Sequence, residues 1–410
     1  DDFGCVAFEE VDSAIEENDK KKTRLIRVQA SADACLGGIS NRDEVWLKID
    51  QVKQIQSEYG RADLYERKWQ SEADGDFINS VPINGEMLRS FTAMQFNTLA
   101  EGLSSGPTSK TPFPCDSTNK DDEKNCFGGF TEIKHPEIAL DFNLRRWRLL
   151  EVILGSSSRE KGNDPPFDLI AMEEVDRYRG FFAPVLNHFG YQGIFTPKFR
   201  APGIQLGWYS DGCALFWKTS TFDLVSERRL RYHIGNQAFL IATLHHKGSN
   251  HHIVVGVTHL KARKSVNNEK IRMRQVCELL DKLEEERERI QTDSDEKEVP
   301  TLILGDFNAD PPSKDRDKSC VAQVLDHHEE AFCPPYLSAY PIEPPPKGFF
   351  TTWKTRGVET VKRVIDYIFY SNMSCTDTLC IPDEKEIEVD QLPGLRYPSD
   401  HLMVAARFRL

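Results

Sequence analysis

Side chains that could bind a metal ion or a phosphate group follow predicted strands at several separate places in the sequence. These places are Asn97 after 91–96, Glu173 and Glu174 after 167–172, His259 after 253–257, Asp306 and Asn308 after 301–304, Asp366 after 364–365, and Asp400 and His401 just before 402–408. One polar residue at a strand end is ordinary turn chemistry. Six places that supply Asn, Glu, Asp and His are more typical of a catalytic cluster assembled from several strand ends.

The residue types in this set indicate metal-assisted phosphate chemistry. Carboxylates and amides without cysteine suit a hard cation, Mg²⁺ or Mn²⁺, better than structural zinc. Two histidines beside them could contact a phosphoryl group and stabilise its developing charge. The sequence has neither a GxSxG nucleophile elbow nor a P-loop, so an acyl-enzyme or an NTPase has no motif here. Hydrolysis of a phosphate ester by metal-activated water is the remaining interpretation.

Composition limits the substrate and the compartment. The chain has 410 residues, 39% of them hydrophobic, and a net charge of −13, which disfavours broad affinity for duplex DNA and favours a small anion held by a local basic pocket. Its ten cysteines form no CxxC pair, which is typical of reduced intracellular thiols. No apolar run approaches the roughly 18 residues of a membrane span. We expect a monomer in the cytoplasm, or in the mitochondrion if an upstream targeting segment has been removed.

The elements that must position these residues begin near Arg89. Short apolar strands alternate from there with amphipathic helices at 143–154 and 269–290, which favours a single α+β domain with a large β core over residues 86–410. Residues 1–85 differ, with acidic and lysine-rich stretches and one helix-like segment at 46–59. We expect them to form a partly flexible N-terminal extension. The proline- and glycine-rich segment 104–130 is predicted to be a surface loop.

Seven segments resemble, in order, motifs of the endonuclease/exonuclease/phosphatase superfamily. They are FNTLA (96–100), MEEVD (172–176), GCALFW (212–217), THLKAR (258–263), GDFNADP (305–311), IDYIFY (365–370) and YPSDHL (397–402). GDFN with a terminal SDH is highly specific for this superfamily. Within the superfamily, the motifs resemble those of the branch that contains the poly(A) deadenylases. Within that branch, they most resemble those of the nocturnin (Curled) group. The resemblance covers about residues 89–410 and implies a four-layer αββα sandwich of the DNase I-like type.

The resemblance also implies a role for each position. For the metal ion, Glu174 matches the main metal-binding carboxylate, Asp400 would bind metal directly or through water, and Asn97 would contact the metal site and the phosphate. For the attacking water, Asp306 would orient or deprotonate it, and Asn308 would hold the nucleophile and the phosphate. For the phosphate, His401, polarised by Asp366, would contact it, and His259 would contact one of its oxygens. Pairing a histidine with a carboxylate fixes its tautomer and raises its basicity.

Substrate choice depends on a second set of residues. In the nocturnin group, residues matching Lys198, Lys261 and Arg263 bind the phosphates of NADP(H), with Asn236 near the site, and the enzyme removes the 2′-phosphate to give NAD(H). Cations converging on a small polyanion make physical sense. The alternatives for these residues are a solvated basic loop around Lys264 and a surface lysine at position 198.

Two other functions stay open. A poly(A)-specific 3′-exoribonuclease would bind RNA instead of a dinucleotide, and a non-catalytic scaffold would bind partners in RNA decay or transcription. The intact catalytic set argues against the scaffold. Trp353 could stack on a base or pack in the core. Arg145, Arg146 and Arg148 could form a nucleic-acid patch, but we expect salt bridges to nearby carboxylates.

Overall fold

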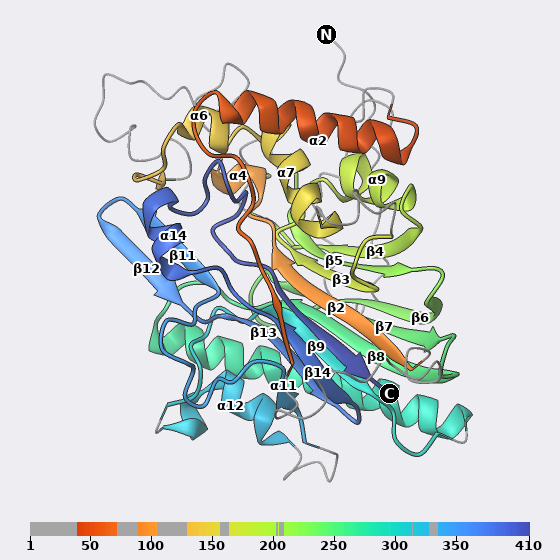
Figure 1. Cartoon of the computed structure of the whole chain (residues 1–410). Coiled ribbons are helices and arrows are strands. Elements are labelled where there is room, and N and C mark those ends of the chain that lie inside the picture. The colour runs from red at the N-terminus through yellow and green to blue at the C-terminus, as the bar shows by residue number, and fades with distance from the viewer. Residues whose placement is uncertain are drawn as a thin grey trace.

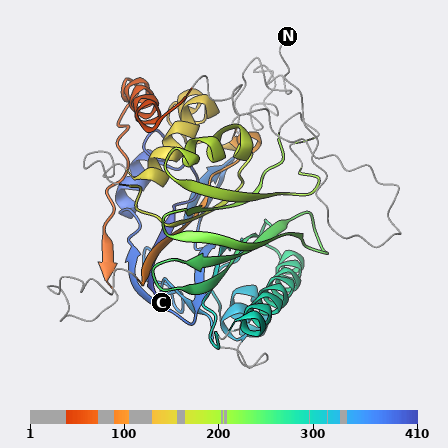
Figure 2. The same ribbon diagram turned by 90° about the vertical axis from the view of Figure 1, so that its right-hand side faces the viewer.

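Two β-sheets pack face to face in the computed structural model of the chain, with helices on both outer sides (Figures 1 and 2). The structure describes residues 39–71, 89–104, 129–155, 164–201, 204, 209–294, 296–313, 315–327 and 335–410. Most of the predicted loop 104–130 and most of the predicted extension 1–85 therefore lie outside the described residues.

The first sheet has seven strands and the second has six. In spatial order, the first sheet holds β1 (Trp69–Ser71), β14 (Ser374–Leu379), β15 (Val404–Arg409), β2 (Ser90–Asn97), β3 (Leu169–Glu173), β5 (Gly212–Lys218) and β4 (Tyr191–Pro197). The second holds β10 (Leu337–Ser338), β13 (Asp366–Ser371), β9 (Thr301–Asp306), β8 (His251–His259), β7 (Ala238–His246) and β6 (Phe222–Arg231). A separate hairpin pairs β11 (Thr352–Arg356) with β12 (Glu359–Arg363).

Helices form the two outer layers. On the side of the first sheet lie α2 (Arg42–Ser57), α4 (Glu101–Ser104), α6 (Pro136–Ala139), α7 (Phe142–Leu154) and α9 (Ala183–Asn187) (Figure 1). On the side of the second sheet lie α11 (Val266–Asp293) and α12 (Cys320–Leu325), and α14 (Glu384–Asp390) lies beside the β11–β12 hairpin. No described helix is apolar enough over the length needed to cross a membrane.

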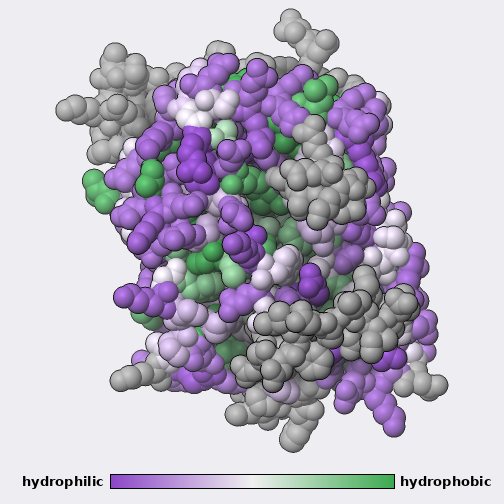
Figure 3. Space-filling view, viewed as in Figure 1, coloured by the Kyte–Doolittle hydropathy of each residue, from purple (hydrophilic) through white to green (hydrophobic). Residues whose placement is uncertain are grey.

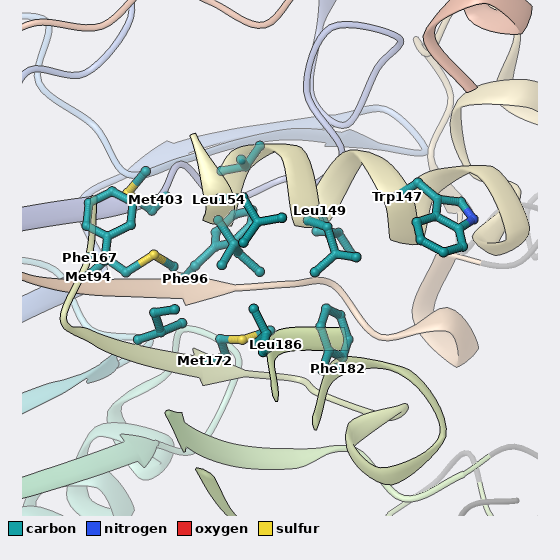
Figure 4. Close-up of a cluster of buried hydrophobic side chains, with 14 of the residues drawn as sticks. Met94, Phe96, Trp147, Leu149, Leu154, Phe167, Met172, Phe182, Leu186 and Met403 are labelled. Atoms are coloured by element: carbon teal, nitrogen blue, oxygen red, sulfur yellow. The ribbon is translucent and has the colours of Figure 1, made fainter. Parts of the chain in front are cut away.

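Alternation along the strands explains the layers. In β2, Phe91 and Ala93 face the second sheet and belong to the apolar core between the two sheets. Met94 and Phe96 point the other way, into the core that α7 covers with Leu149 (Figure 4). A third core lies between α11 and the outer face of the second sheet. Three cores between four layers confirm the predicted α+β sandwich.

Residues 39–71 pack on this sandwich. The side chain of Asn41 accepts a hydrogen bond from Glu44 N (3.0 Å), and Glu44 accepts one from Ser40 N (2.8 Å), a reciprocal cap that starts α2. Val45 and Ile49 of α2 are buried in the core shared with α7. Strand β1 adds an antiparallel edge next to β14. The outer surface is mostly hydrophilic on the face seen in Figure 3, with hydrophobic residues showing mainly near its middle.

Candidate functional site

The strand ends that carry the predicted site residues meet at one end of the sandwich. Strands β2 and β3 run parallel in the first sheet, and β8 and β9 run parallel in the second, so within each pair the carboxyl ends point the same way. The antiparallel strand β13 begins where β9 ends, and Asp366 pairs directly with Asp306. His259 is the partner of Asp306 on the other side. Three predicted residues are therefore neighbours by strand register alone.

Asp306 lies at the centre of this cluster and is almost fully buried. Its carboxylate accepts hydrogen bonds from Asn97 Nδ2 (3.0 Å) and from the main-chain N of Asn308 (2.8 Å). His259 Nε2 lies 3.5 Å and His401 Nε2 lies 3.9 Å from Asp306 Oδ2. Burial raises the pKa of Asp306 to about 6, and the nearby carboxylates add to that shift. A carboxylate with this pKa can accept a proton from a bound water.

His401 and Asp366 form a buried pair. His401 Nδ1 lies 3.1 Å from Asp366 Oδ1 and 3.0 Å from Oδ2, and the Thr351 hydroxyl donates to Oδ2 (2.6 Å). Burial alone would lower the pKa of His401, but the charges of Asp366, Asp400 and Asp306 outweigh it and raise the pKa to about 9. The imidazole is therefore protonated near pH 7, with Nδ1 donating to Asp366 and Nε2 free to donate to an anion.

Among the described residues, Asp306, Asp366 and His401 are grouped closely enough to hold a metal ion. His401 Nδ1 is engaged by Asp366, however, so we interpret this group as an acid–base set. Two other carboxylates keep an oxygen unused. Asp400 is buried, and its Oδ1 has no hydrogen-bond partner in the described part of the chain. Glu174 Oε2 accepts a hydrogen bond from Ala100 N (3.1 Å), and Glu174 Oε1 lies 4.0 Å from His259 Nε2. These oxygens fit a hard cation.

The charge of Asp400 is maintained by residues that the sequence reading missed. Lys354 Nζ lies 2.7 Å and Arg356 Nη2 lies 3.8 Å from Asp400 Oδ2, and both come from strand β11. Burial raises the pKa of Asp400, but the charges of Lys354, His401 and Arg356 together outweigh burial, so the net shift is downward. The β-type run 352–363 could have predicted this hairpin, because Gly357 interrupts the run and has the positive φ (59°) that a tight turn needs.

The mostly buried side chain of Lys198 is paired with Asp211. Burial would lower the pKa of Lys198, but Asp211 and then Glu174 outweigh it and raise the pKa. The buried His259 has a pKa well below the usual value, first because of burial and then because of the Lys198 charge. The charge of Lys198 therefore interacts with that of Glu174 and lowers the pKa of His259. Asn236 is joined to this segment through its carbonyl oxygen, which accepts from Phe199 N (3.0 Å).

Lys261 and Arg263 lie on the loop that leaves β8 just after His259. Arg272 of α11 donates to the carbonyl oxygens of Lys261 (2.7 Å) and Arg263 (3.1 Å), and Gln275 accepts from Lys261 N (3.0 Å). These bonds fix the backbone of the loop. No described residue forms a hydrogen bond or an ion pair with the Lys261 ammonium or the Arg263 guanidinium, and none links them to Lys198.

The structure tests the predictions for the arginines of α7 and for Trp353. Arg145 is fully buried and donates to main-chain carbonyl oxygens and the Ser104 hydroxyl, so the predicted salt bridge is wrong for this residue. Arg148 does pair with Glu151, as predicted. Trp353 is buried edge-on against Phe350 (5.4 Å between ring centroids), which favours core packing over base stacking.

Backbone strain is concentrated where strands leave the sheets. Leu99, Glu174 and Asn308 have φ angles of 57°, 56° and 52°, in the left-handed region that side chains other than glycine avoid. Each such residue costs about 1–3 kcal/mol, and such positions cluster at functional sites. The strain turns the chain sharply, and Glu174 and Asn308 themselves belong to the cluster.

The chain matches known proteins over most of its length. It matches the model of the Endonuclease/Exonuclease/phosphatase family over residues 125–401. It is 32% identical to nocturnin of Rattus norvegicus over 330 residues, which covers 77% of this chain and 64% of that protein. It is 27% identical to the CCR4-Not complex 3′-5′-exoribonuclease subunit Ccr4 of Yarrowia lipolytica over 331 residues, covering 67% of this chain and 44% of that protein.

A solved structure agrees with the observed fold. The human nocturnin catalytic domain with bound sulfate anion has a TM-score of 0.54 and 24% identity, covering 84% of this chain and 96% of that chain. The predicted resemblance to the nocturnin group is confirmed, although this chain spans only 64% of the length of rat nocturnin. The chain belongs to the endonuclease/exonuclease/phosphatase family.

Proposed function

We propose that this phosphoesterase removes the 2′-phosphate of NADP⁺ and NADPH to give NAD⁺ and NADH, with Mg²⁺ as its metal ion and Mn²⁺ as a substitute. The observation that carries the proposal is a set of cations on the segments that leave β4 and β8, two of which have no partner among the described residues. Arg272 fixes the backbone of Lys261 and Arg263, and neither of their cationic groups has a partner among the described residues. The charges of Lys198 and Glu174 act on each other. Such cations suit the several phosphate groups of one small molecule.

Glu174 Oε1 and Asp400 Oδ1, which accept no hydrogen bond in the described part of the chain, would hold the ion, and the bound ion would supply a Lewis acid and an activated water. Asp306 accepts the proton of the attacking water, and Asn97 holds the Asp306 carboxylate in place. Protonated His401 donates from Nε2 to an oxygen of the phosphate, where charge develops.

Cleavage of poly(A) from its 3′ end is the second candidate, since Ccr4 exoribonucleases are among the relatives. The net charge of −13 supports the smaller substrate, because a long polyanion has to approach the whole surface and a dinucleotide only the pocket. Lys261 and Arg263 separate the two candidates. A dinucleotide phosphatase depends on both, whereas an exonuclease holding several nucleotides tolerates Lys261→Ala.

The test compares phosphate release from NADP⁺, NADPH and a short oligo(A) with Mg²⁺, followed by chromatography of the products. NAD⁺, which lacks the 2′-phosphate, serves as the substrate control. We expect release from both dinucleotides, intact NAD(H) as product, and no release with Glu174→Ala. Arg263→Ala should raise KM, whereas Lys264→Ala should not, because Lys264 is already paired with Asp310 (2.8 Å). Shortened RNA with unchanged NADP(H) would refute the proposal in favour of the exonuclease.

A further inference from the structure

Strand β2 presents two buried amides to the second sheet. Gln95 and Asn97 are two residues apart and therefore share a face of the strand, and both are 0% exposed. Asn97 Nδ2 donates to Asp306 Oδ2 (3.0 Å), and Gln95 Nε2 donates to Asp366 Oδ1 (3.0 Å). Asp306 and Asp366 are direct partners in strands β9 and β13. The two amides thus tie the first sheet to a pair of carboxylates in the second, directly beneath the cluster.

The amide of Gln95 has a second partner. Its Nε2 also donates to Glu173 Oε2 (2.7 Å), at the fully buried end of β3. An amide nitrogen carries two protons, so one goes to each carboxyl group, and this fixes the orientation of the amide. Gln95 belongs to the first sheet and Asp366 to the second, so Glu173 acts as the anchor from which Gln95 reaches across.

Asp366 is consequently held from three directions. The Thr351 hydroxyl donates to Oδ2 (2.6 Å), Gln95 donates to Oδ1 (3.0 Å), and both oxygens lie within 3.1 Å of His401 Nδ1. Without Gln95, only Thr351 and His401 would hold the carboxylate, which could then turn about its side-chain bond. His401 Nδ1 would then contact one oxygen of Asp366 instead of two, and the orientation of the imidazole ring would no longer be fixed.

We infer that Gln95 is a positioning residue for hydrolysis, because it fixes the Asp366 carboxylate that orients His401, with Glu173 as its anchor. Among the described residues, Gln95 forms no hydrogen bond with Glu174 or Asp400, the carboxylates proposed to hold the ion. Its effect should therefore be confined to the chemical step. The inference rests on the proposed function only through the choice of substrate, because the Gln95–Asp366–His401 contacts serve any phosphate ester.

The test uses Gln95→Met, which keeps the side-chain length and removes the donor. The matched control is Gln56→Met, since Gln56 is equally buried but lies on α2. We expect Gln95→Met to lower kcat roughly tenfold to a hundredfold with KM unchanged, and Gln56→Met to leave both constants unchanged. Thermal unfolding of both variants shows whether the fold is kept. Should Gln95→Met not fold, Gln95→Asn, whose amide is one methylene too short, replaces it.

A second readout needs no substrate. The proton on His401 Nδ1, held by Asp366, should give a strongly downfield NMR signal, identified by its loss in His401→Gln. We expect Gln95→Met to shift this signal upfield or broaden it, and Gln56→Met to leave it unchanged. An unchanged signal, an unchanged kcat or a rise in KM alone would overturn the inference. If the wild-type chain cleaves oligo(A) and not NADP(H), the proposed substrate is wrong. The role of Gln95 is then tested by the same NMR signal and by kcat and KM measured on RNA.

Discussion

Replacing Arg145 with Met should lower the free energy of unfolding of the chain and also slow its phosphate release. The guanidinium donates to the carbonyl oxygens of Thr98 (2.8 Å), Leu99 (2.6 Å) and Pro398 (3.0 Å), and to the Ser104 hydroxyl (3.0 Å). The first two carbonyls follow Asn97, and the third lies two residues before Asp400. One side chain of α7 therefore holds the two loops that leave β2 and lead into β15.

The magnitude follows from what the change leaves unpaired. Each buried carbonyl that loses its donor costs about 1–3 kcal/mol. Against this, burial opposes the charge of Arg145 and lowers its pKa, so removing the charge recovers part of that cost. Three such carbonyls would cost about 3–9 kcal/mol, so after this recovery we expect a net loss of about 3–5 kcal/mol. That is a large part of the roughly 5–15 kcal/mol that stabilises a domain.

Urea unfolding followed by far-UV circular dichroism measures this loss. The control is Arg42→Met, because the Arg42–Asp164 pair is exposed (3.0 Å; 45% and 60% of the side chains accessible) and should contribute no more than about 1 kcal/mol. Phosphate release is measured below the unfolding transition, where Arg145→Met should still be slower than the wild type. Equal midpoints for the two variants would refute the view that Arg145 holds these loops.

Three further predictions concern the site. The pKa of His401 is about 9, above the usual 6.5. The stabilisation of the folded chain by protonated His401 is therefore fully present below pH 6.5 and is lost as the pH rises through 9. The urea midpoint of the wild type should fall over that pH range, and the midpoint of His401→Gln should fall less. Lys198→Met should destabilise the chain by about 3–5 kcal/mol, because it leaves Asp211 nearly buried without its partner; adding Asp211→Leu should restore the midpoint but not phosphate release. Gly305→Ala should abolish activity or soluble expression, because its Cβ would lie 2.1 Å from Thr258 O, a main-chain atom that only a shift of the strand can move.

The sequence predicted most of the sandwich, but not its edges. Strands β2, β8 and β9 are buried on both faces and therefore appear as continuous apolar runs, which the sequence reading found. Strand β6 is the edge of the second sheet, and of its ten residues only Phe222 is buried, so its polar sequence gave no strand signal. Strand β6 could not be predicted because its side chains are exposed. Weak pairing is not the reason, since β6 pairs with β7 along its whole length.

The catalytic cluster was predictable in its strand-end residues and unpredictable in their supports. The carboxyl ends of neighbouring parallel strands lie at the same edge of a sheet, which groups Asn97 with Glu174 in the first sheet and His259 with Asp306 in the second. Gln95, Lys354 and Arg145 could not be predicted, because each acts on a partner more than 40 positions away in the chain. Their own surroundings in the sequence are those of an ordinary strand or helix.

Substrate specificity was the least predictable property, and the reason lies in ion pairing. The basic run 261–264 contains cations that look equivalent in the sequence. In the structure Lys264 is paired with Asp310, whereas Lys261 and Arg263 have no such partner among the described residues. An unpaired cation gains a full charge-assisted contact from a phosphate, while a paired one has to give up a contact of similar strength. Selectivity for a phosphorylated dinucleotide should therefore follow Lys261 and Arg263, not the number of basic residues in the loop.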